Sequence, residues 1–239
     1  MQDLNNKVAL ITGGSKGIGL GIAEAMVKEG MKVAITSRSQ AAADQAAQQL
    51  NNISAGSAIG IQADVVDYEA QEASLQQTIK AFGQLDVLIA NAGVGHFAPV
   101  ESLSLDQWKQ TIDINLTGVF YSVKAAVTEI KKSQGYIITI ASLAGTNFFA
   151  AGAAYNASKF GLVGFTQAIM LDLRQAGVKV TTIMPGSVST HFNGRTPTDA
   201  EAWKIQPEDL GQITTDLLKM HPRTLPSKVE VRPSMPPRK

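Results

Sequence analysis

Short runs of apolar, mostly β-branched residues recur along the chain, and each run is flanked by glycine or polar residues. Such runs are typical of buried β-strands, because a strand that is covered on both faces does not alternate between apolar and polar positions. The pattern predicts strands at residues 7–12, 32–36, 57–62, 85–90, 136–141 and 178–184, and a last short strand at 228–231.

Between these runs lie longer stretches with apolar residues spaced three and four apart, which is the pattern of amphipathic helices. The predicted helices cover residues 18–29, 41–50, 69–82, 106–131, 155–175 and 207–220. Strands that alternate with helices require crossover connections, and they form a parallel sheet with helices on both faces. We therefore expect a doubly wound α/β fold in three layers, with a central, mostly parallel sheet of about seven strands.

The regular pattern loosens after residue 184, where the sequence "PGSVSTHFNGRTPTDAEAW" is rich in glycine, proline, serine and threonine. A loop of this length beside a compact sheet is more often a lid than a linker. We expect a single domain over residues 1–239, with a substrate loop at about 188–206 that forms part of it.

Composition narrows the function classes. The chain has 239 residues, 44% of them hydrophobic, and its 21 Lys and Arg nearly balance its 20 Asp and Glu. A net charge of +1 creates no strong field, so we expect neither a nucleic acid nor a membrane as partner. The absence of cysteine excludes disulfides and thiolate chemistry, and His96, His191 and His221 show no metal-ligand spacing, so no metal is expected. We expect the start of the chain to be neither a signal peptide nor a membrane anchor, and we expect a cytoplasmic protein.

The stretch "VALITGGSKGIGLGIAEAMV" predicts a strand, a glycine turn and a helix in the first βαβ unit. Gly13, Gly17 and Gly19 would let the backbone approach a pyrophosphate at the positive end of the helix, as in the Rossmann dinucleotide-binding fold. The alternative is a tight turn without a ligand. A P-loop is disfavoured, because no Lys-Ser or Lys-Thr pair follows the last glycine.

The end of the second predicted strand bears on the choice of nucleotide. An acidic residue at that position would bind the ribose 2′-hydroxyl of NAD, but this chain has Ser37 and Arg38, with Lys16 inside the glycine turn. Two cations near a 2′-phosphate favour NADP(H) over NAD(H), although both could be solvated surface residues. Asp64, after the third strand, could accept a hydrogen bond from the adenine amino group or cap the following helix.

Tyr155 and Lys159 lie four residues apart in a predicted helix, so they share one helical face. A nearby ammonium is expected to lower the pKa of the phenol and make it a general acid or base. Alone, the pair would be an ordinary surface Tyr and Lys. Ser142 changes this interpretation, because it ends a strand at the carboxyl edge of the sheet, where a hydroxyl can hold a substrate oxygen.

Together these motifs resemble those of the classical short-chain dehydrogenase/reductase family. The resemblance extends from about residue 7 to residue 190, and it rests on "TGGSKGIG", "NAG" at 91–93, Asn115 in "DINLTG", Ser142, "YNASK" at 155–159 and "PGSVST" at 185–190. It implies that Tyr155 is the acid/base and Ser142 the orienting hydroxyl. It also implies that Lys159 lowers the pKa of the phenol and binds the nicotinamide ribose, and that Asn115 interrupts its helix to hold a water in a proton relay.

The resemblance and the glycine turn imply an extended NADP(H) site. Its expected residues are Gly13, Ser15, Lys16, Gly17, Ile18, Gly19, Ser37, Arg38, Asp64, Val65, Asn91, Ala92, Gly93, Tyr155, Lys159, Pro185, Gly186, Val188 and Thr190. Aromatic residues near the Ser and Tyr are the candidate walls for a carbonyl or alcohol substrate, although each could belong to the core: His96, Phe97, Phe148, Phe149 and Phe192.

The implied reaction is hydride transfer between NADPH and a carbonyl substrate, by a homodimer or homotetramer that uses the helices at 106–131 and 155–175. Three departures from the family pattern are visible. Ala90 replaces a frequent asparagine, and the C-terminus lacks the glycine-rich ending typical of bacterial ketoacyl-carrier-protein reductases. The segment after Thr190 is also short, so we expect a small lid and a comparatively open substrate cleft. One alternative is a non-catalytic NADP(H) sensor or scaffold, but such a protein would have little reason to keep the catalytic set together. An epimerase or dehydratase of nucleotide sugars would be expected to be longer.

Overall fold

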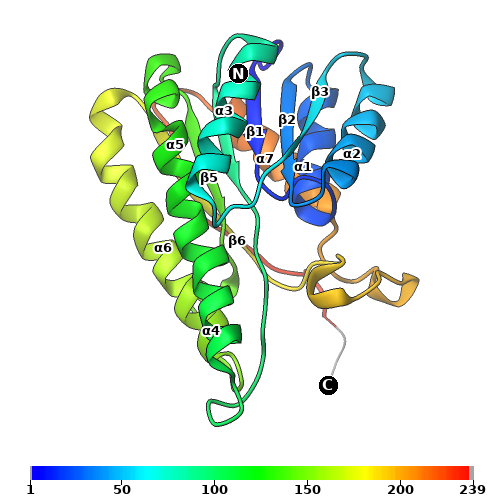
Figure 1. Cartoon of the computed structure of the whole chain (residues 1–239), viewed down its shortest axis with the longest axis vertical. Coiled ribbons are helices and arrows are strands. Elements are labelled where there is room, and N and C mark those ends of the chain that lie inside the picture. Colours follow the sequence, from blue (N-terminus) through cyan, green and yellow to red (C-terminus); the bar gives the residue numbers. More distant parts are fainter. Residues whose placement is uncertain (1, 237–239) are drawn as a thin grey trace.

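A computed structural model of the protein describes residues 2–236. Its centre is a seven-stranded sheet in the order β3-β2-β1-β4-β5-β6-β7, and every neighbouring pair is parallel (Figure 1). The sheet grows outward from β1 in both directions, as expected for a doubly wound fold. The strands are β1 (Val8–Ile11), β2 (Lys32–Ser37), β3 (Ala58–Gln62), β4 (Val87–Ala90), β5 (Tyr136–Ile140), β6 (Lys179–Pro185) and β7 (Lys228–Val231).

Helices cover both faces of the sheet, which confirms the three-layer arrangement. One face packs against α1 (Gly17–Lys28), α2 (Gln40–Ile53) and α7 (Pro207–Lys219), and the other packs against α3 (Tyr68–Phe82), α5 (Gly118–Ser133) and α6 (Ala153–Leu173). In β5, the buried side chain of Ile138 joins the first core cluster and that of its neighbour Ile137 joins the second. This two-sided burial explains why the strands are apolar throughout.

The helix that the apolar spacing predicted at 106–131 is wrong as a single element, and its interruption includes Asn115, where the family resemblance implied one. The structure divides it into α4 (Leu105–Ile112), a π-helical turn at Asp113–Thr117, and α5. A π-turn inserts one extra residue per turn into the backbone, which the three-and-four spacing of apolar side chains does not reveal. Single 3-10 turns also occur, at Leu143–Gly145, Arg174–Ala176, Phe192–Gly194 and Asp199–Glu201.

The loops at the carboxyl ends of the strands lie together beyond one edge of the sheet. Figure 1 shows the loop after β4 and the segment after β6, coloured gold to orange, extending past this same edge. The strand order reverses between β1 and β4, and such a reversal opens a crevice for a ligand. No helix among residues 2–236 is long and apolar enough to cross a membrane.

Candidate active site

The glycine turn between β1 and α1 has the backbone conformation that its sequence predicted. Gly13 and Gly17 have φ values of 63° and 57°, in the left-handed region that favours glycine. Gly19 is packed so closely that an added Cβ would lie 2.6 Å from both the Asn91 Nδ2 and the Gly13 carbonyl oxygen. The Asn91 amide in turn donates to the carbonyls of Thr12 and Gly13, at 2.9 and 3.0 Å. The turn is therefore fixed against the end of β4.

The Thr12 hydroxyl completes this junction. It accepts hydrogen bonds from the backbone N–H groups of Asn91 and Ala92, at 3.0 and 3.2 Å. Ala90, where the family often has asparagine, is buried in β4. The end of the strand is thus hydrogen-bonded without an amide side chain at position 90.

The basic residues expected to discriminate between nucleotides lie at one end of a cavity. Lys16, Ser37 and Arg38 all line it, and the Ser15 hydroxyl donates to the Ser37 hydroxyl at 3.3 Å, joining the glycine turn to the end of β2. Asp64 lines the same cavity and accepts a hydrogen bond from the Val66 N–H at 3.2 Å. The helix-cap alternative for Asp64 is wrong, because the N-cap of α3 is Asp67.

The sequence predicted a helix at 41–50 but assigned it no role in the site, and so missed the contribution of α2. Ala42, Gln45, Ala46 and Gln49 line the cavity. Their spacing of three, one and three residues places them on a single helical face. This spacing was visible in the sequence, but only the packing of α2 against α1 shows which face meets the cavity.

At the other end of the cavity lie Ser142, Tyr155 and Lys159. Lys159 is 4% exposed, and its Nζ donates to the Ile140 carbonyl oxygen at 3.0 Å, so the last residue of β5 positions the amine. The Nζ lies 5.8 Å from the centroid of the Tyr155 ring. The structure therefore brings these three side chains together, as the sequence predicted.

The expected effect of Lys159 on the phenol is not found. Burial raises the pKa of the Tyr155 phenol above its usual range, and a hydrogen bond with Ser142 only partly opposes this rise. Burial also lowers the pKa of the Lys159 ammonium to about 8. Within residues 2–236 no carboxylate forms a salt bridge with Lys159. Desolvation, which disfavours the charged forms of both groups, is thus the largest influence on each pKa.

Asn115 lies in the π-helical turn and is fully buried, behind the cavity. Its side chain accepts from the Val94 N–H at 2.8 Å and donates to the Val94 carbonyl at 2.9 Å and to the Ser158 hydroxyl at 3.0 Å. The side chain thus joins the loop after β4 to α6. Because these bonds use both amide hydrogens, a water bound at this turn would depend on main-chain groups.

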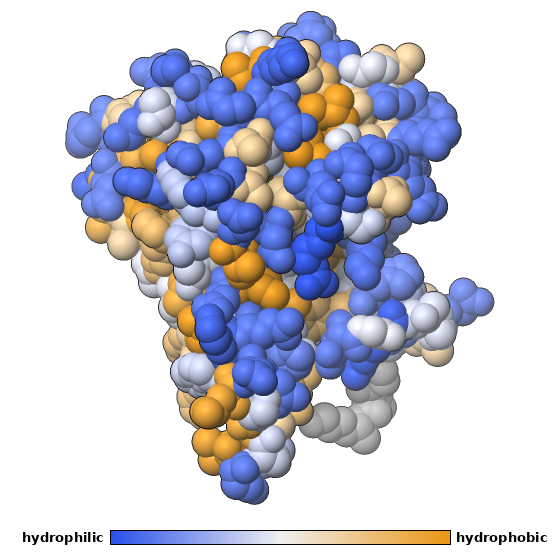
Figure 2. Space-filling view, viewed as in Figure 1, coloured by the Kyte–Doolittle hydropathy of each residue, from blue (hydrophilic) through white to orange (hydrophobic). Residues whose placement is uncertain are grey.

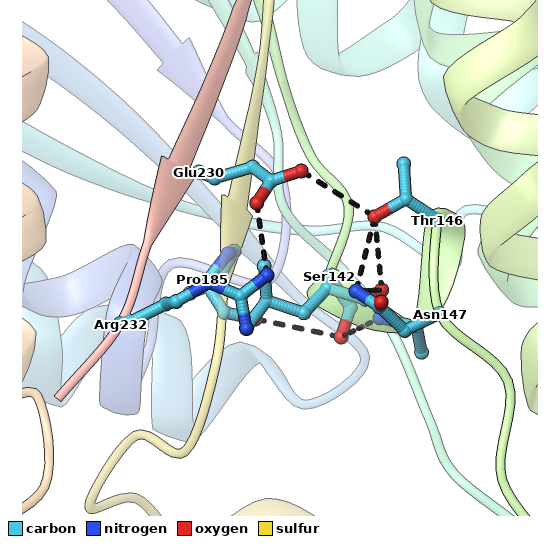
Figure 3. A network of polar contacts seen from close by, with 8 residues as sticks. Ser142, Thr146, Asn147, Pro185, Glu230 and Arg232 are labelled. Atoms are coloured by element: carbon cyan, nitrogen blue, oxygen red, sulfur yellow. Dashed lines mark hydrogen bonds and ion pairs between the residues drawn. The ribbon is translucent and has the colours of Figure 1, made fainter.

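The loop that carries Ser142 is held by a polar network with the last two strands (Figure 3). The Ser142 hydroxyl donates to the Pro185 carbonyl at the end of β6, at 3.5 Å. The Thr146 hydroxyl donates to a carboxylate oxygen of Glu230 in β7, also at 3.5 Å, and Arg232 forms a 3.0 Å ion pair with the other oxygen. The loop after β5 is therefore positioned by residues that are distant in sequence.

Asn156, in α6, also holds the loop after β5 in place. Its amide nitrogen donates to the carbonyls of Ala144 and Asn147, both at 2.8 Å. Sequence analysis gave no role to Asn156, or to Ser158, which accepts from Asn115. Both lie between Tyr155 and Lys159, so the motif holds the site together as well as supplying its reactive groups.

The five expected substrate-wall residues separate into three groups. His96 and Phe192 line the cavity. Phe97 and Phe149 lie in an aromatic cluster next to Tyr155. Phe148 is 87% exposed, has no place in this cluster and does not line the cavity, so its assignment is wrong.

One cavity of about 910 Å³ connects these features. Among the predicted cofactor residues, all except Gly19 line it, and Gly19 instead packs within the glycine turn. The cavity runs from the basic end near β2, past the glycine turn, to the Ser, Tyr and Lys side chains. An elongated molecule with an anionic centre would fit this arrangement.

The model of the family described as short chain dehydrogenase matches residues 7–201. This range includes the glycine turn, Ser142, Tyr155 and Lys159, and it exceeds half of the chain. The chain belongs to the short-chain dehydrogenase/reductase family. Proteins of this family bind a nicotinamide dinucleotide and act as oxidoreductases on small molecules, so the resemblance seen in the sequence is confirmed.

Individual relatives agree with this assignment. The trans-4-hydroxycyclohexanecarboxylate dehydrogenase of Sinomonas cyclohexanicum is 38% identical over 189 residues, which are 77% of this short-chain dehydrogenase and 73% of that protein. The 3-oxoacyl-(acyl-carrier-protein) reductase of a Synechocystis strain is 36% identical over 192 residues, 80% of this chain and 77% of that one. The alcohol dehydrogenase of the archaeon Thermococcus sibiricus, solved with 5-hydroxy-NADP, has a TM-score of 0.90 at 27% identity, covering 98% and 99% of the two chains.

Proposed function

We propose that this short-chain dehydrogenase/reductase uses NADP(H) to interconvert a carbonyl compound and its alcohol. The observation that carries the proposal is the shared cavity: Ser142, Tyr155 and Lys159 line one end, and the glycine turn and Arg38 line the other. A protein that only bound the nucleotide would gain nothing from the first set. The sensor or scaffold alternative is therefore not favoured.

The residues of the cavity fit a nicotinamide dinucleotide. The turn at Gly13 and Gly17 presents backbone at the start of α1, where N–H groups can hold a pyrophosphate. Asp64 and Val65 would contact the adenine end, and Val188 and Thr190 the nicotinamide end. When bound, the cofactor supplies or accepts the hydride, and the protein orients the substrate and moves the proton.

Tyr155 is the proposed acid in the direction of carbonyl reduction. Because burial raises the pKa of its phenol, the group holds its proton at neutral pH and can donate it to a substrate oxygen. The Ser142 hydroxyl, which lines the same end of the cavity, would hold the same oxygen. Lys159 would bind the ribose, and its ammonium would stabilise the phenolate left after proton transfer. The π-turn at Asn115 would hold a water that restores the proton.

The preference for NADP(H) over NAD(H) rests on Arg38 and Lys16. Both line the cavity, and neither forms a salt bridge within residues 2–236. An unpaired guanidinium and an ammonium beside the Ser37 hydroxyl would bind a ribose 2′-phosphate well. No carboxylate stands at the end of β2 to bind a 2′-hydroxyl instead.

The proposed substrate carries a ketone or a secondary alcohol. The names of two relatives, a dehydrogenase of a hydroxycyclohexane acid and a reductase of oxoacyl groups, share this functional group. We also propose that the chain forms one domain and that residues 188–206 act as its substrate loop. An isolated β-bridge between Val188 and Ile205 joins the two ends of this loop.

We further propose a homodimer or homotetramer in the cytoplasm. Several large apolar side chains around α4 and α5 are exposed, among them Val100, Leu105, Trp108 and Phe120. Figure 2 shows hydrophobic residues among hydrophilic ones at the lower tip of the molecule, just below α4 in Figure 1. A partner subunit would cover such side chains. Sedimentation analysis and cell fractionation would test the two proposals.

The decisive experiment replaces Tyr155 with phenylalanine. Loss of the phenol should lower kcat with a panel of ketones and aldehydes by about 10²–10⁴-fold, while the Kd for NADPH changes by less than about threefold. Tyr121→Phe, in α5 and outside the cavity lining, is the matched control and should retain full activity. Activity that survives in Tyr155→Phe would contradict the assignment. Tight NADPH binding by the wild type without turnover of any carbonyl would favour the sensor instead.

A further inference from the structure

Two phenylalanine rings contact the ring of Tyr155 and a third supports one of them, and the three come from three different loops. The Phe97 ring, after β4, meets the Tyr155 ring edge-on, with centroids 5.4 Å apart and an interplanar angle of 67°. The Phe192 ring, after β6, lies 5.9 Å away at 60°. Phe149, before α6, supports Phe97 at 5.8 Å. These are the separations of favourable aromatic pairs.

Gly95 forms the floor between two of these rings. A Cβ at position 95 would lie 2.7 Å from the Phe192 Cζ and 3.0 Å from the Phe97 Cζ. Both rings therefore converge on bare backbone, which any side chain at position 95 would block. The two Cζ atoms therefore lie close together above Gly95, and the Phe192 ring occupies the space beside Tyr155 that a flat group would fill if Phe192 moved outward.

Phe192 belongs to the substrate loop, in which hydrogen bonds hold the two ends together but not the middle. The Ser189 hydroxyl donates to Glu201 at 3.1 Å, and the Ser189 N–H donates to the Ile205 carbonyl at 2.9 Å. Phe192 is 37% exposed, and it precedes Asn193, which has a left-handed φ of 59°. A substrate ring that moved the Phe192 ring away from Tyr155 would itself contact both rings. These contacts would replace the lost contact between Phe192 and Tyr155.

Charge is sparse at this end of the cavity. Of the described residues that line it near Tyr155, only Lys159 and two histidines are basic, and none is a carboxylate. His96 is engaged with the Gln110 side chain at 2.6 Å. A cationic group placed between the rings would lose its hydration without gaining an ion pair.

We propose that a flat ring inserts between Phe192 and the Tyr155 ring, so that Gly95, Phe97 and Phe192 form an aromatic slot that selects carbonyl compounds carried on a flat ring without a positive charge. The inference rests on the proposed function, because it assumes that Tyr155 faces the reacting carbonyl. It goes further in naming the substrate class: aryl and other flat cyclic ketones are preferred over open-chain ketones of equal size.

The test compares acetophenone with methyl hexyl ketone, which has the same number of carbon atoms. Because conjugation changes the reactivity of a carbonyl, dissociation constants are measured first, on the NADPH complex of Tyr155→Phe. The slot predicts about tenfold tighter binding of acetophenone, which is the contribution expected of one or two aromatic pairs. Aminomethylacetophenone, the ring with an ammonium group, should bind more weakly than acetophenone.

Phe97→Leu and Phe192→Leu, made in the same background, should each reduce the preference for the ring by about three- to tenfold. Phe82→Leu is the control, at the end of α3 and far from the carboxyl ends of the strands. It should leave the preference for acetophenone over methyl hexyl ketone unchanged. Unchanged urea midpoints would show that the variants fold. A preference for methyl hexyl ketone, or one that both slot variants retain, would overturn the proposal. Failure of the proposed function would look different, because the wild type would oxidise no NADPH with either ketone.

Discussion

Lys159 offers a sharp test of how burial controls the charges at this site. Its amine is almost completely buried, has one hydrogen-bond acceptor, the Ile140 carbonyl, and has a pKa lowered by desolvation from 10.5 to about 8. One pKa unit corresponds to about 1.4 kcal/mol, so keeping this ammonium charged costs the folded protein about 3 kcal/mol at neutral pH.

The sign of the pH dependence follows from proton binding. Between about pH 8 and pH 10.5 the unfolded chain holds a proton on Lys159 that the folded chain has released. The free energy of unfolding therefore rises with pH across this window, and the cost is complete below it and absent above it. Lys159→Met keeps an apolar side chain of similar length and removes the titration. The free energy of unfolding of this variant minus that of the wild type should therefore decrease by about 2 kcal/mol from pH 7 to pH 10.

The measurement is urea unfolding of the cofactor-free protein, followed by tryptophan fluorescence at fixed protein concentration and at several values between pH 7 and pH 10. Comparison of the variant with the wild type cancels the titration of all other groups and any constant loss of packing. Lys80→Met, at an exposed position of α3, is the control, and it should follow the wild type because Lys159 is still present. A difference between Lys159→Met and wild type that stays constant with pH would refute the reasoning.

Two further substitutions probe the cofactor end of the cavity. Arg38→Asp should raise the Kd for NADPH by about 100-fold and that for NADH by less than about threefold, as measured by fluorescence titration, and equal losses would place the 2′-phosphate elsewhere. Gly19→Ala should destabilise the fold by about 2 kcal/mol, because its Cβ would lie 2.6 Å from the Gly13 carbonyl oxygen. Gly164→Ala, with no neighbour within 4 Å, should instead stabilise α6 by about 0.5 kcal/mol, and similar urea midpoints for the two variants would contradict the close contact at Gly19.

Local pattern was enough to predict most of the fold. Strand positions follow from apolar runs such as that of β5, and the parallel sheet follows from their alternation with helices. The reactive pair could also be predicted, because Tyr155 and Lys159 share one turn of α6 whatever surrounds it. The glycine turn could also be predicted from local sequence, because Gly13 and Gly17 adopt backbone conformations that other residues disfavour.

Features that depend on contacts between distant segments could not be predicted in this way. The π-turn at Asn115 depends on hydrogen bonds to Val94 and Ser158, and the apolar spacing continues through it unchanged. The site also places Phe192 against Gly95, which lies far from it in the sequence.

The pKa values of Tyr155 and Lys159 show most clearly which properties the sequence determines and which depend on the tertiary structure. The sequence determined that an amine lies one turn from the phenol, and from this it suggested a lowered phenol pKa. Tertiary packing reversed the direction, because Tyr155 and Lys159 are both buried and desolvation opposes charge on each of them. Spacing along one helix is a local property that the sequence determines by itself, whereas burial is decided only when the helices, the sheet and the loops close around the same residues.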